Sequence, residues 1–247
     1  MNKQKVRFED LGKMDYQAAW DYQESLLQDN VRKKSQRFNM VPGEEGEEFL
    51  MQHDSKELET NHSFLLVEHP PVYTLGKSGN ADNILITEEV RTLKGIEFFR
   101  TNRGGDITFH GPGQIVGYPI LDLEKYYTDI GKYLRNIEQV IILTLAEYGI
   151  KGDRSPGETG VWIDPEIKGR ERKICAIGVR SSRWITMHGF ALNVNTDLSY
   201  FNYIIPCGIS NKQVTSISKE LGKEINYEEA KEKIKKNFQV VFESELY

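Results

Sequence analysis

The chain has 247 residues and a formal net charge of −5, and 38% of its residues are hydrophobic while 28% are charged. This length allows one large domain or two small ones, and the composition is that of an ordinary folded protein. A negative net charge gives no support for nucleic-acid binding, which normally shows a basic footprint. The sequence lacks both an apolar run long enough to cross a bilayer and a signal-peptide core, so we expect no membrane association.

The sequence contains two cysteines, Cys175 and Cys207, without the spacing of metal ligands. Two cysteines do not form a disulfide framework, and their pattern does not indicate a zinc site. We therefore expect a cytoplasmic protein that holds no metal.

The first half of the chain predicts one helix followed by short strands. Asp15 can cap a helix that carries Ala19, Tyr22 and Leu26 on one face. Residues 38–60 are acidic and irregular, which is typical of a surface insertion. Strands are predicted at residues 63–68, 72–75, 97–100 and 114–121.

The second half predicts two longer helices and further strands. Apolar residues recur every three or four positions from Ile130 to Tyr148, and a capping box at Asn226 begins a final helix. The remaining predicted elements are strands at 161–163, 173–179 and 184–193 and a short helix ending near Gly222.

Strands in succession with few helical crossovers predict an α+β fold with a mixed, largely antiparallel sheet flanked by helices. We expect a catalytic domain over residues 1–210, with a C-terminal helical appendage of the same domain over residues 211–247.

The segment from Arg103 to Gly113 is the most informative part of the sequence. It contains two adjacent glycines, then His110, then a second glycine pair around Pro112. Glycines let a ligand approach the backbone closely, and fixed N–H groups with Arg103 and His110 could polarise a carbonyl oxygen. The alternative is a glycine-rich hairpin that binds nothing.

Cys207 and Lys173 form the candidate chemical pair. Cys207 lies between Pro206 and Gly208 in a predicted turn, and Lys173 opens an apolar strand. An ammonium favours a nearby thiolate, and a partly desolvated lysine can transfer protons, so together they could catalyse acyl transfer through a thioester. The alternatives are a cysteine buried for packing and a lysine at a solvated strand end.

Two further residues, Cys175 and His188, lie on the strands predicted around the candidate pair. Cys175 is two residues from Lys173, so strand alternation predicts that a second thiol lies near the pocket. His188 shares its predicted face with Phe190, Leu192 and Val194, so a core role is as reasonable as a catalytic one.

With these segments in view, the sequence resembles the lipoyl(octanoyl) transferase family. The resemblance covers residues 63 to 222 and rests on five segments that occur in the family's order. They are Glu68–Gly76 (EHPPVYTLG), Arg103–Pro119 (RGGDITFHGPGQIVGYP), Lys173–Gly178 (KICAIG), His188–Asn193 (HGFALN) and Pro206–Ile209 (PCGI).

The resemblance implies the fold of the biotin and lipoate protein ligases, with Cys207 as acyl-thioester nucleophile and Lys173 as the residue that lowers the pKa of its thiol. It also implies substrate contacts from three segments. These are Arg103, Gly104, Gly105, Asp106, Ile107, Thr108, Phe109 and His110; then Ala176, Ile177 and Gly178; then Gly189, Phe190 and Ala191.

By the same resemblance, the reaction moves an octanoyl group from octanoyl-acyl carrier protein to a lysine of lipoyl domains. The acceptors would be 2-oxoacid dehydrogenases and the glycine cleavage H protein, and we expect a monomer that needs no cofactor. Two alternatives stay open: an ATP-dependent lipoate or biotin ligase, which needs no cysteine nucleophile, and a non-catalytic module that binds acyl carrier protein.

A basic segment suggests how acidic partners could dock. Residues 168–183 carry six cations against one carboxylate, and the segment runs into and out of the candidate pair. We expect Arg180 and Arg183 to join Lys173 around the mouth of the pocket and to steer acidic partners. The alternative is a solvated hairpin.

Overall fold

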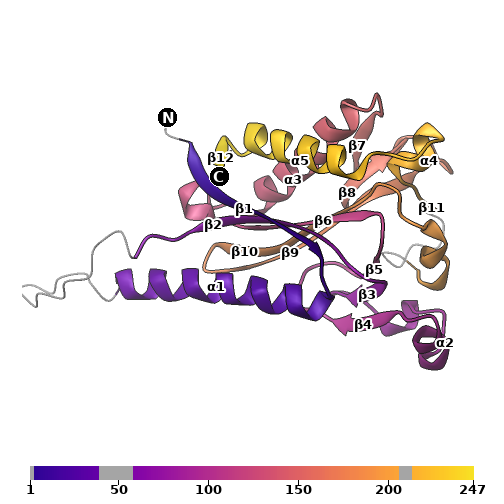
Figure 1. Ribbon diagram of the computed structural model, residues 1–247, viewed down its shortest axis with the longest axis horizontal. Helices are drawn as coiled ribbons and strands as arrows, with labels where there is room; N and C mark the ends of the chain where they lie inside the picture. The colour runs from indigo at the N-terminus through magenta and orange to yellow at the C-terminus, as the bar shows by residue number, and fades with distance from the viewer. Residues whose placement is uncertain (1–2, 39–57, 206–212) are drawn as a thin grey trace, which may run out of the picture.

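A computed structural model describes residues 3–38, 58–205 and 213–247. Within these ranges nine strands form one large sheet, in the order β12-β1-β2-β6-β10-β9-β8-β7, with β11 pairing on β9 (Figure 1). Antiparallel ladders join β2, β6, β10, β9, β8 and β7, while β1 is parallel to both β2 and β12. The predicted mixed, largely antiparallel sheet is therefore confirmed.

Each face of the large sheet buries its own apolar cluster. Side chains alternate across the strands, so Phe64 and Leu66 of β2 face helices α3 and α5, whereas Leu65 and Val67 face helix α1. Figure 1 shows α3 and α5 on one side of the sheet and α1 on the other. The molecule is thus three layers deep where these helices lie.

A second sheet of three strands, in the order β4-β3-β5, lies near the start of α1 (Figure 1). Its own cluster includes Tyr73, Phe109 and Phe201. Tyr16, at the first position of α1, stacks on His110 of β5, with ring centroids 6.0 Å apart. The small sheet therefore packs beside the α1-facing side of the large sheet, and the space between them is the cavity described below.

The helices begin where capping groups satisfy their first N–H groups. Asp129 accepts a hydrogen bond from the Lys132 N–H at the start of α3, and Asn226 accepts one from the Glu229 N–H at the start of α5. Gly222 ends α4 in the left-handed conformation, with φ of 67°.

The buried face of α1 extends beyond the predicted one. Ala19 is buried as expected, and Tyr22 and Leu26 pack half-buried against the same cluster, but the buried positions also include Tyr16, Gln23, Leu27, Asn30 and Lys34. The polar members of this face have partners: Gln23 accepts the His188 N–H, Asn30 bonds the backbone of residue 61, and Lys34 pairs with an aspartate. The buried polar groups of α1 are therefore satisfied by hydrogen bonds and an ion pair.

The structure also contains strands that the sequence pattern did not reveal, namely β1, β5, β7, β11 and β12. Strands β11 and β12 and helices α4 and α5 come from residues 213–247, and α5 packs on α3. No helix in the described ranges is long and apolar enough to cross a membrane.

The strands are β1 Gln4–Lys13, β2 His62–Glu68, β3 Val72–Leu75, β4 Glu97–Arg100, β5 Ile107–His110, β6 Gln114–Ile120, β7 Gly152–Ser155, β8 Glu158–Ile163, β9 Arg172–Ser182, β10 Ile185–Asn193, β11 Gln213–Val214 and β12 Ser244–Leu246. The helices are α1 Tyr16–Phe38, α2 Glu88–Leu93, α3 Ile130–Ala146, α4 Ile217–Leu221 and α5 Tyr227–Val241, with 3-10 turns at Ala81–Asn83, Leu123–Lys125 and Leu198–Tyr203.

Candidate active site

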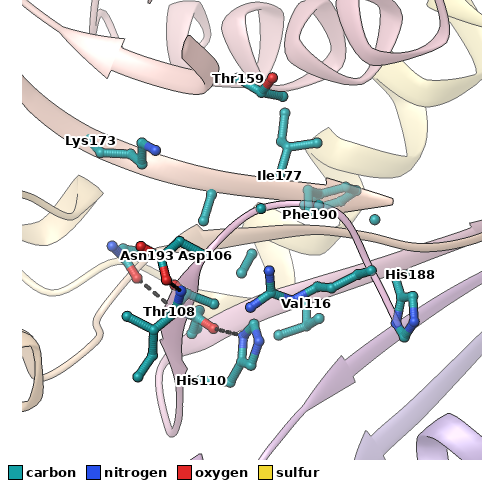
Figure 2. A pocket seen from close by; sticks show the side chains of 18 of the residues that line it. Asp106, Thr108, His110, Val116, Thr159, Lys173, Ile177, His188, Phe190 and Asn193 are labelled. Atoms are coloured by element: carbon teal, nitrogen blue, oxygen red, sulfur yellow. Dashed lines mark hydrogen bonds between the residues drawn. The ribbon is translucent and has the colours of Figure 1, made fainter. Parts of the chain in front are cut away.

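A cavity of about 450 Å³ lies between the large sheet and the glycine-rich loop that precedes β5. Val116, Ala176, Gly178 and Ala191 contribute its large-sheet wall, and Arg103 lies on the wall opposite. Figure 2 shows Lys173 and His188 at different ends of the group of lining side chains. A cavity that is apolar on one side and carries a few fixed polar groups on the other is suited to a small ligand with an apolar part.

Backbone hydrogen bonds hold the glycine-rich loop against its neighbours. The N–H groups of Gly76, Lys77 and Ser78 donate to backbone oxygens of residues 103–106, and the Gly104 N–H donates to the Val179 oxygen of β9 at 2.9 Å. A Cβ built on Gly76 would lie 2.2 Å from the Gly105 oxygen. The glycines are therefore needed for the close approach of these loops.

A buried chain of hydrogen bonds crosses the cavity wall. Arg103 Nη2 donates to the Thr74 oxygen at 2.6 Å and to Thr74 Oγ1 at 2.8 Å. Thr74 Oγ1 is 3.1 Å from His110 Nε2, and His110 Nδ1 is 2.9 Å from Gln114 Oε1. Gln114 Nε2 donates to Asn193 Oδ1 at 2.8 Å (Figure 2 draws part of this chain). We call this chain, from Arg103 to Asn193, the polar relay.

The polar relay fixes the protonation of His110. Gln114 Nε2 also donates to the Phe109 oxygen, so Gln114 Oε1 is left as the acceptor for His110 Nδ1–H. His110 Nε2 then accepts the Thr74 hydroxyl. Burial, together with nearby His69 and Arg103, holds the pKa of His110 well below its usual range. His110 is therefore a neutral, oriented part of the wall.

The relay ends beside Lys173. Asn193 Nδ2 donates to the Thr215 oxygen at 3.0 Å, and the Thr215 N–H donates to the Lys173 oxygen at 2.9 Å. The two candidate segments of the sequence, the glycine-rich loop and the start of β9, are thus joined by one continuous set of bonds.

Lys173 lines the cavity at the start of β9 and faces β8. Its ammonium lies 3.9 Å from Glu158 Oε2 and 4.6 Å from the centre of the Trp162 ring. Glu158, Gly160 and Trp162 alternate along β8 and so share one face. A carboxylate and an aromatic face both attract a cation, so β8 holds the lysine side chain in place.

Cys175 is not among the residues that line the cavity, and the prediction that it shares a face with Lys173 is wrong. The β8–β9 ladder pairs Val161 with Cys175 but Trp162 with Lys173, so Ile174 is an extra residue in β9. This irregularity turns Cys175 into the cluster beneath α3, where burial raises the pKa of its thiol.

His188 also departs from the predicted alternation. Its φ is 58°, in the left-handed region, and its ring lines the cavity without joining the cluster under α3, whereas Phe190 belongs to that cluster and also lines the cavity. His188 Nε2 lies 2.7 Å from Asn102 Oδ1, and the ring meets Trp20 of α1 edge to face. Burial lowers the pKa of His188 to about 3.

Most of the predicted site residues line this one cavity. They are Arg103, Gly105, Asp106, Ile107, Thr108, His110, Lys173, Ala176, Ile177, Gly178, Gly189, Phe190 and Ala191. Gly104 bonds β9 and is not among the lining residues, and Phe109 stacks on Tyr200 in the small-sheet cluster, with ring centroids 4.5 Å apart. Cys207 lies outside the described residues.

Sequence reasoning missed several lining or supporting residues, among them Tyr16, Glu158 and Trp162. Period-two alternation from Glu158 to Trp162 on β8, opposite Lys173, is the signal that could have found two of them. Tyr16 carries no local signal, because its position depends on how α1 packs on the small sheet.

The prediction that Arg180 and Arg183 surround the same mouth as Lys173 is wrong. They follow Lys173 by seven and ten residues, and a strand rises about 3.3 Å per residue, so they lie at the other end of the β9 hairpin. Arg180 pairs there with Glu24 of α1 at 2.8 Å, and Arg183 donates to Ser35.

The fold that holds this cavity is shared with known proteins. A family model described as the lipoyl protein ligase A/B catalytic domain matches residues 15–239. The chain therefore belongs to this family of catalytic domains, as its motifs indicated.

Relatives within the family are more specific. The chain is 56% identical to an octanoyltransferase of Christiangramia forsetii over 247 residues, which is 100% of this chain and 99% of the relative. It is 55% identical to an octanoyltransferase of Flavobacterium psychrophilum over 98% of both chains.

Solved structures share the fold at low sequence identity. A bi-partite lipoate protein ligase of Thermoplasma acidophilum matches with a TM-score of 0.66 at 15% identity, covering 99% of this chain and 86% of that one. A lipoate-protein ligase A bound with ATP matches with a TM-score of 0.64 at 13% identity, covering 100% and 90%. The fold is therefore shared with ATP-binding ligases and does not by itself decide the reaction.

Proposed function

We propose that the chain transfers an octanoyl group from octanoyl-acyl carrier protein to a lysine of lipoyl domains, through a thioester on Cys207, as a step of lipoate biosynthesis. The observation that carries this proposal is the full-length similarity, above half identity, to relatives named octanoyltransferase. The cavity supports it, because an apolar wall beside a lysine suits an acyl chain with a reactive end.

In the first half-reaction the Cys207 thiolate attacks the thioester carbonyl of the donor. A new carbon–sulfur bond forms to Cys207, the bond to the phosphopantetheine sulfur breaks, and Lys173 gives its proton to that leaving sulfur. The glycine-rich loop offers a fixed wall against which the acyl group is positioned.

In the second half-reaction the amine of the acceptor lysine attacks the Cys207 thioester. The carbon–sulfur bond breaks, an amide forms, and the now neutral Lys173 takes the proton that the amine releases. The thiolate and the ammonium are thereby restored. An amide is more stable than a thioester, so the transfer requires no ATP.

The chain on either side of residues 206–212 supports a role for Cys207. Phe201, shortly before this segment, and Val214, shortly after it, both line the cavity. Val214 also pairs with Lys173 in the β11–β9 ladder. The described chain before and after this segment thus contributes residues to the cavity lining.

The partners and location form the finer part of the proposal. We propose lipoyl domains of 2-oxoacid dehydrogenases and the glycine cleavage H protein as acceptors, with the reaction taking place in the cytoplasm. A sequence with two cysteines and no indication of a disulfide framework suits a reducing compartment.

Mass spectrometry of the protein mixed with octanoyl-acyl carrier protein, without ATP, tests the proposal. We expect a covalent octanoyl adduct on the wild type and on Cys175→Ser, and none on Cys207→Ser, because Cys175 is buried away from the cavity. Adding a lipoyl domain should discharge the adduct.

An ATP-dependent ligase and a non-catalytic binding module both predict no adduct in this mixture. Octanoyl transfer that appears only with ATP would replace the proposal by the ligase alternative. An adduct that persists in Cys207→Ser and disappears in Cys175→Ser would reverse the assignment of the two thiols.

A further inference from the structure

A fully buried carboxylate on α3, Glu138, lies outside the cavity but contacts the strand that holds Lys173. Its side chain is 0% exposed, and Glu138 Oε1 accepts the Gly160 N–H of β8 at 3.1 Å. Glu138 Oε2 pairs with Arg135 at 2.7 Å and with Arg154 at 2.9 Å. A buried carboxylate is costly unless it is paired and hydrogen-bonded, and these three contacts satisfy it.

Gly160 connects this carboxylate to Lys173. Its φ is 126°, a conformation that other residues rarely adopt, and a Cβ built on it would lie 2.6 Å from the Cys175 oxygen. The same position is 3.5 Å from Lys173 Cε and 3.7 Å from Lys173 Cδ. The backbone of Gly160 is therefore the surface on which the lysine side chain rests.

The irregular pairing of β8 with β9 occurs at this same place. Val161 pairs with Cys175 and Trp162 with Lys173, and the extra residue Ile174 is what lets Lys173 face the cavity. An irregular ladder has fewer strand-to-strand bonds to fix its geometry, so a bond from another element has more influence there. Glu138 supplies such a bond from α3.

We propose that Glu138 is a positioning residue for Lys173, acting through the backbone of Gly160. It holds the part of β8 that lies opposite the irregularity in β9, so that Glu158, Gly160 and Trp162 keep the lysine ammonium at one place in the cavity. This inference rests on the proposed role of Lys173 in octanoyl transfer, but the position of the side chain is measurable without that reaction.

The decisive comparison is between Glu138→Leu and Glu138→Gln. Both remove the charge that pairs with Arg135 and Arg154, but only Gln keeps an oxygen that can accept the Gly160 N–H. We expect Glu138→Leu to lower kcat about a hundredfold with little change in KM, because displacing a catalytic group by about 1 Å has that effect. Glu138→Gln should keep most of kcat.

An activity-independent readout follows from the Trp162 ring. Lys173 Nζ lies 4.6 Å from the ring centre, so the ring current shifts the ε-methylene resonance of Lys173 upfield. NMR of protein with ¹³C-labelled lysine, assigned through Lys173→Arg, should show that shift reduced in Glu138→Leu and kept in Glu138→Gln. If octanoyl transfer itself is absent from the wild type, this readout still tests the position.

Glu147→Gln is the matched control. Glu147 follows α3 and pairs with Lys233 and Lys236, so its loss removes ion pairs near the same helix but far along it from Gly160. It should leave both kcat and the Lys173 resonance unchanged.

Unchanged kcat and an unchanged Lys173 resonance in a folded Glu138→Leu protein would overturn the proposal. If that variant does not fold, Gly160→Ala decides instead, because its added Cβ displaces the same backbone while Glu138 is intact. A folded Gly160→Ala protein with wild-type kcat and resonance would overturn the proposal equally.

Discussion

Arg103 and Lys173 are two cations on the wall of one cavity, and they are held by different kinds of partner. Arg103 is bonded to backbone oxygens of β3 and of its own loop and to the Thr74 hydroxyl, at 2.6 to 3.0 Å. Lys173 lies against side chains of β8 at longer range, 3.9 Å from a carboxylate oxygen and 4.6 Å from an indole centre. The first arrangement suits a fixed, permanent charge, and the second suits a group that exchanges a proton.

This difference separates two tasks within a small volume. The polar relay from Arg103 to Asn193 is made of groups whose hydrogen-bonding roles are settled, so it gives the wall its shape. The ammonium of Lys173 lies near a carboxylate and a ring face of β8. The cavity therefore combines a rigid side with the side on which we propose that the proton transfers take place.

Replacing Lys173 by arginine should have the largest effect on the rate of octanoyl transfer. Lys173→Arg keeps the positive charge but removes a group that can give and take a proton near neutral pH. Octanoyl transfer should fall by about 10²–10⁴-fold, the usual contribution of general acid–base catalysis. A wild-type transfer rate in this variant, measured by mass spectrometry of the lipoyl domain, would show that the charge alone is sufficient.

Acidification should destabilise the folded protein through its buried histidines. Burial lowers the pKa of His62 and His69 to about 4, that of His188 to about 3, and that of His110 well below its usual range. As the pH falls, the unfolded chain therefore takes up a proton at each of these histidines before the folded protein does. The stability present at neutral pH is lost as the pH falls below about 6.5.

By pH 5.5 the loss should be about 1 kcal/mol for each histidine, or several kcal/mol in total. Urea unfolding at pH 7.5, 6.5 and 5.5 measures it. His62 lies outside the cavity lining, and His62→Asn should remove one proton from the number taken up on unfolding, so the free energy of unfolding should depend less on pH. A free energy of unfolding that stays constant over this range would contradict the assignment of neutral histidines.

The reverse exchange, Arg103→Lys, should act on stability more than Lys173→Arg does. A lysine cannot reproduce the forked donors that reach Thr74 and the Gly104 oxygen, so buried acceptors lose their partner. We expect the free energy of unfolding to fall by about 1.5–3 kcal/mol, the value of a hydrogen bond to a charged group. Equal losses of stability in the two exchanged variants would remove the distinction drawn between the two cations.

The smallest effect should come from cations at the other end of the β9 hairpin. The double variant Arg180→Ala/Arg183→Ala should leave the salt dependence of kcat/KM as it is in the wild type, because these residues contact α1 and not the Lys173 end. Transfer from octanoyl-acyl carrier protein at ~20 mM and ~300 mM salt measures this. A weaker salt dependence in the variant would restore these arginines as docking residues.

Local patterns predicted much of this architecture. Strand β3 begins and ends at the predicted residues, and α3 and α5 follow their apolar periodicity, because each depends on neighbours in sequence. Strands β1 and β12 escaped prediction because they pair in parallel with each other, one near each end of the chain. Pairing between such distant segments leaves little local pattern.

The candidate site was predictable where the type of residue is itself informative. It was unpredictable where side chains depart from the regular alternation of a strand. The glycines and Arg103 predict the loop directly from the sequence. By contrast, one extra residue at Ile174 moves Cys175 to the opposite face, and the left-handed φ of His188 takes its ring away from the core. Both departures are single-residue events of the backbone, and period-two counting assumes that such events are absent.

The close contacts between loops around the cavity also limit which substitutions can accumulate in this protein during evolution. A Cβ on Gly76 would lie 2.2 Å from the oxygen of Gly105, and a Cβ on Gly178 would lie 2.8 Å from the oxygen of Gly104. A single methyl group on either glycine therefore displaces a backbone from another part of the chain. Variants selected for a different acyl group would have to keep these glycines and alter side chains instead, such as that of Val116.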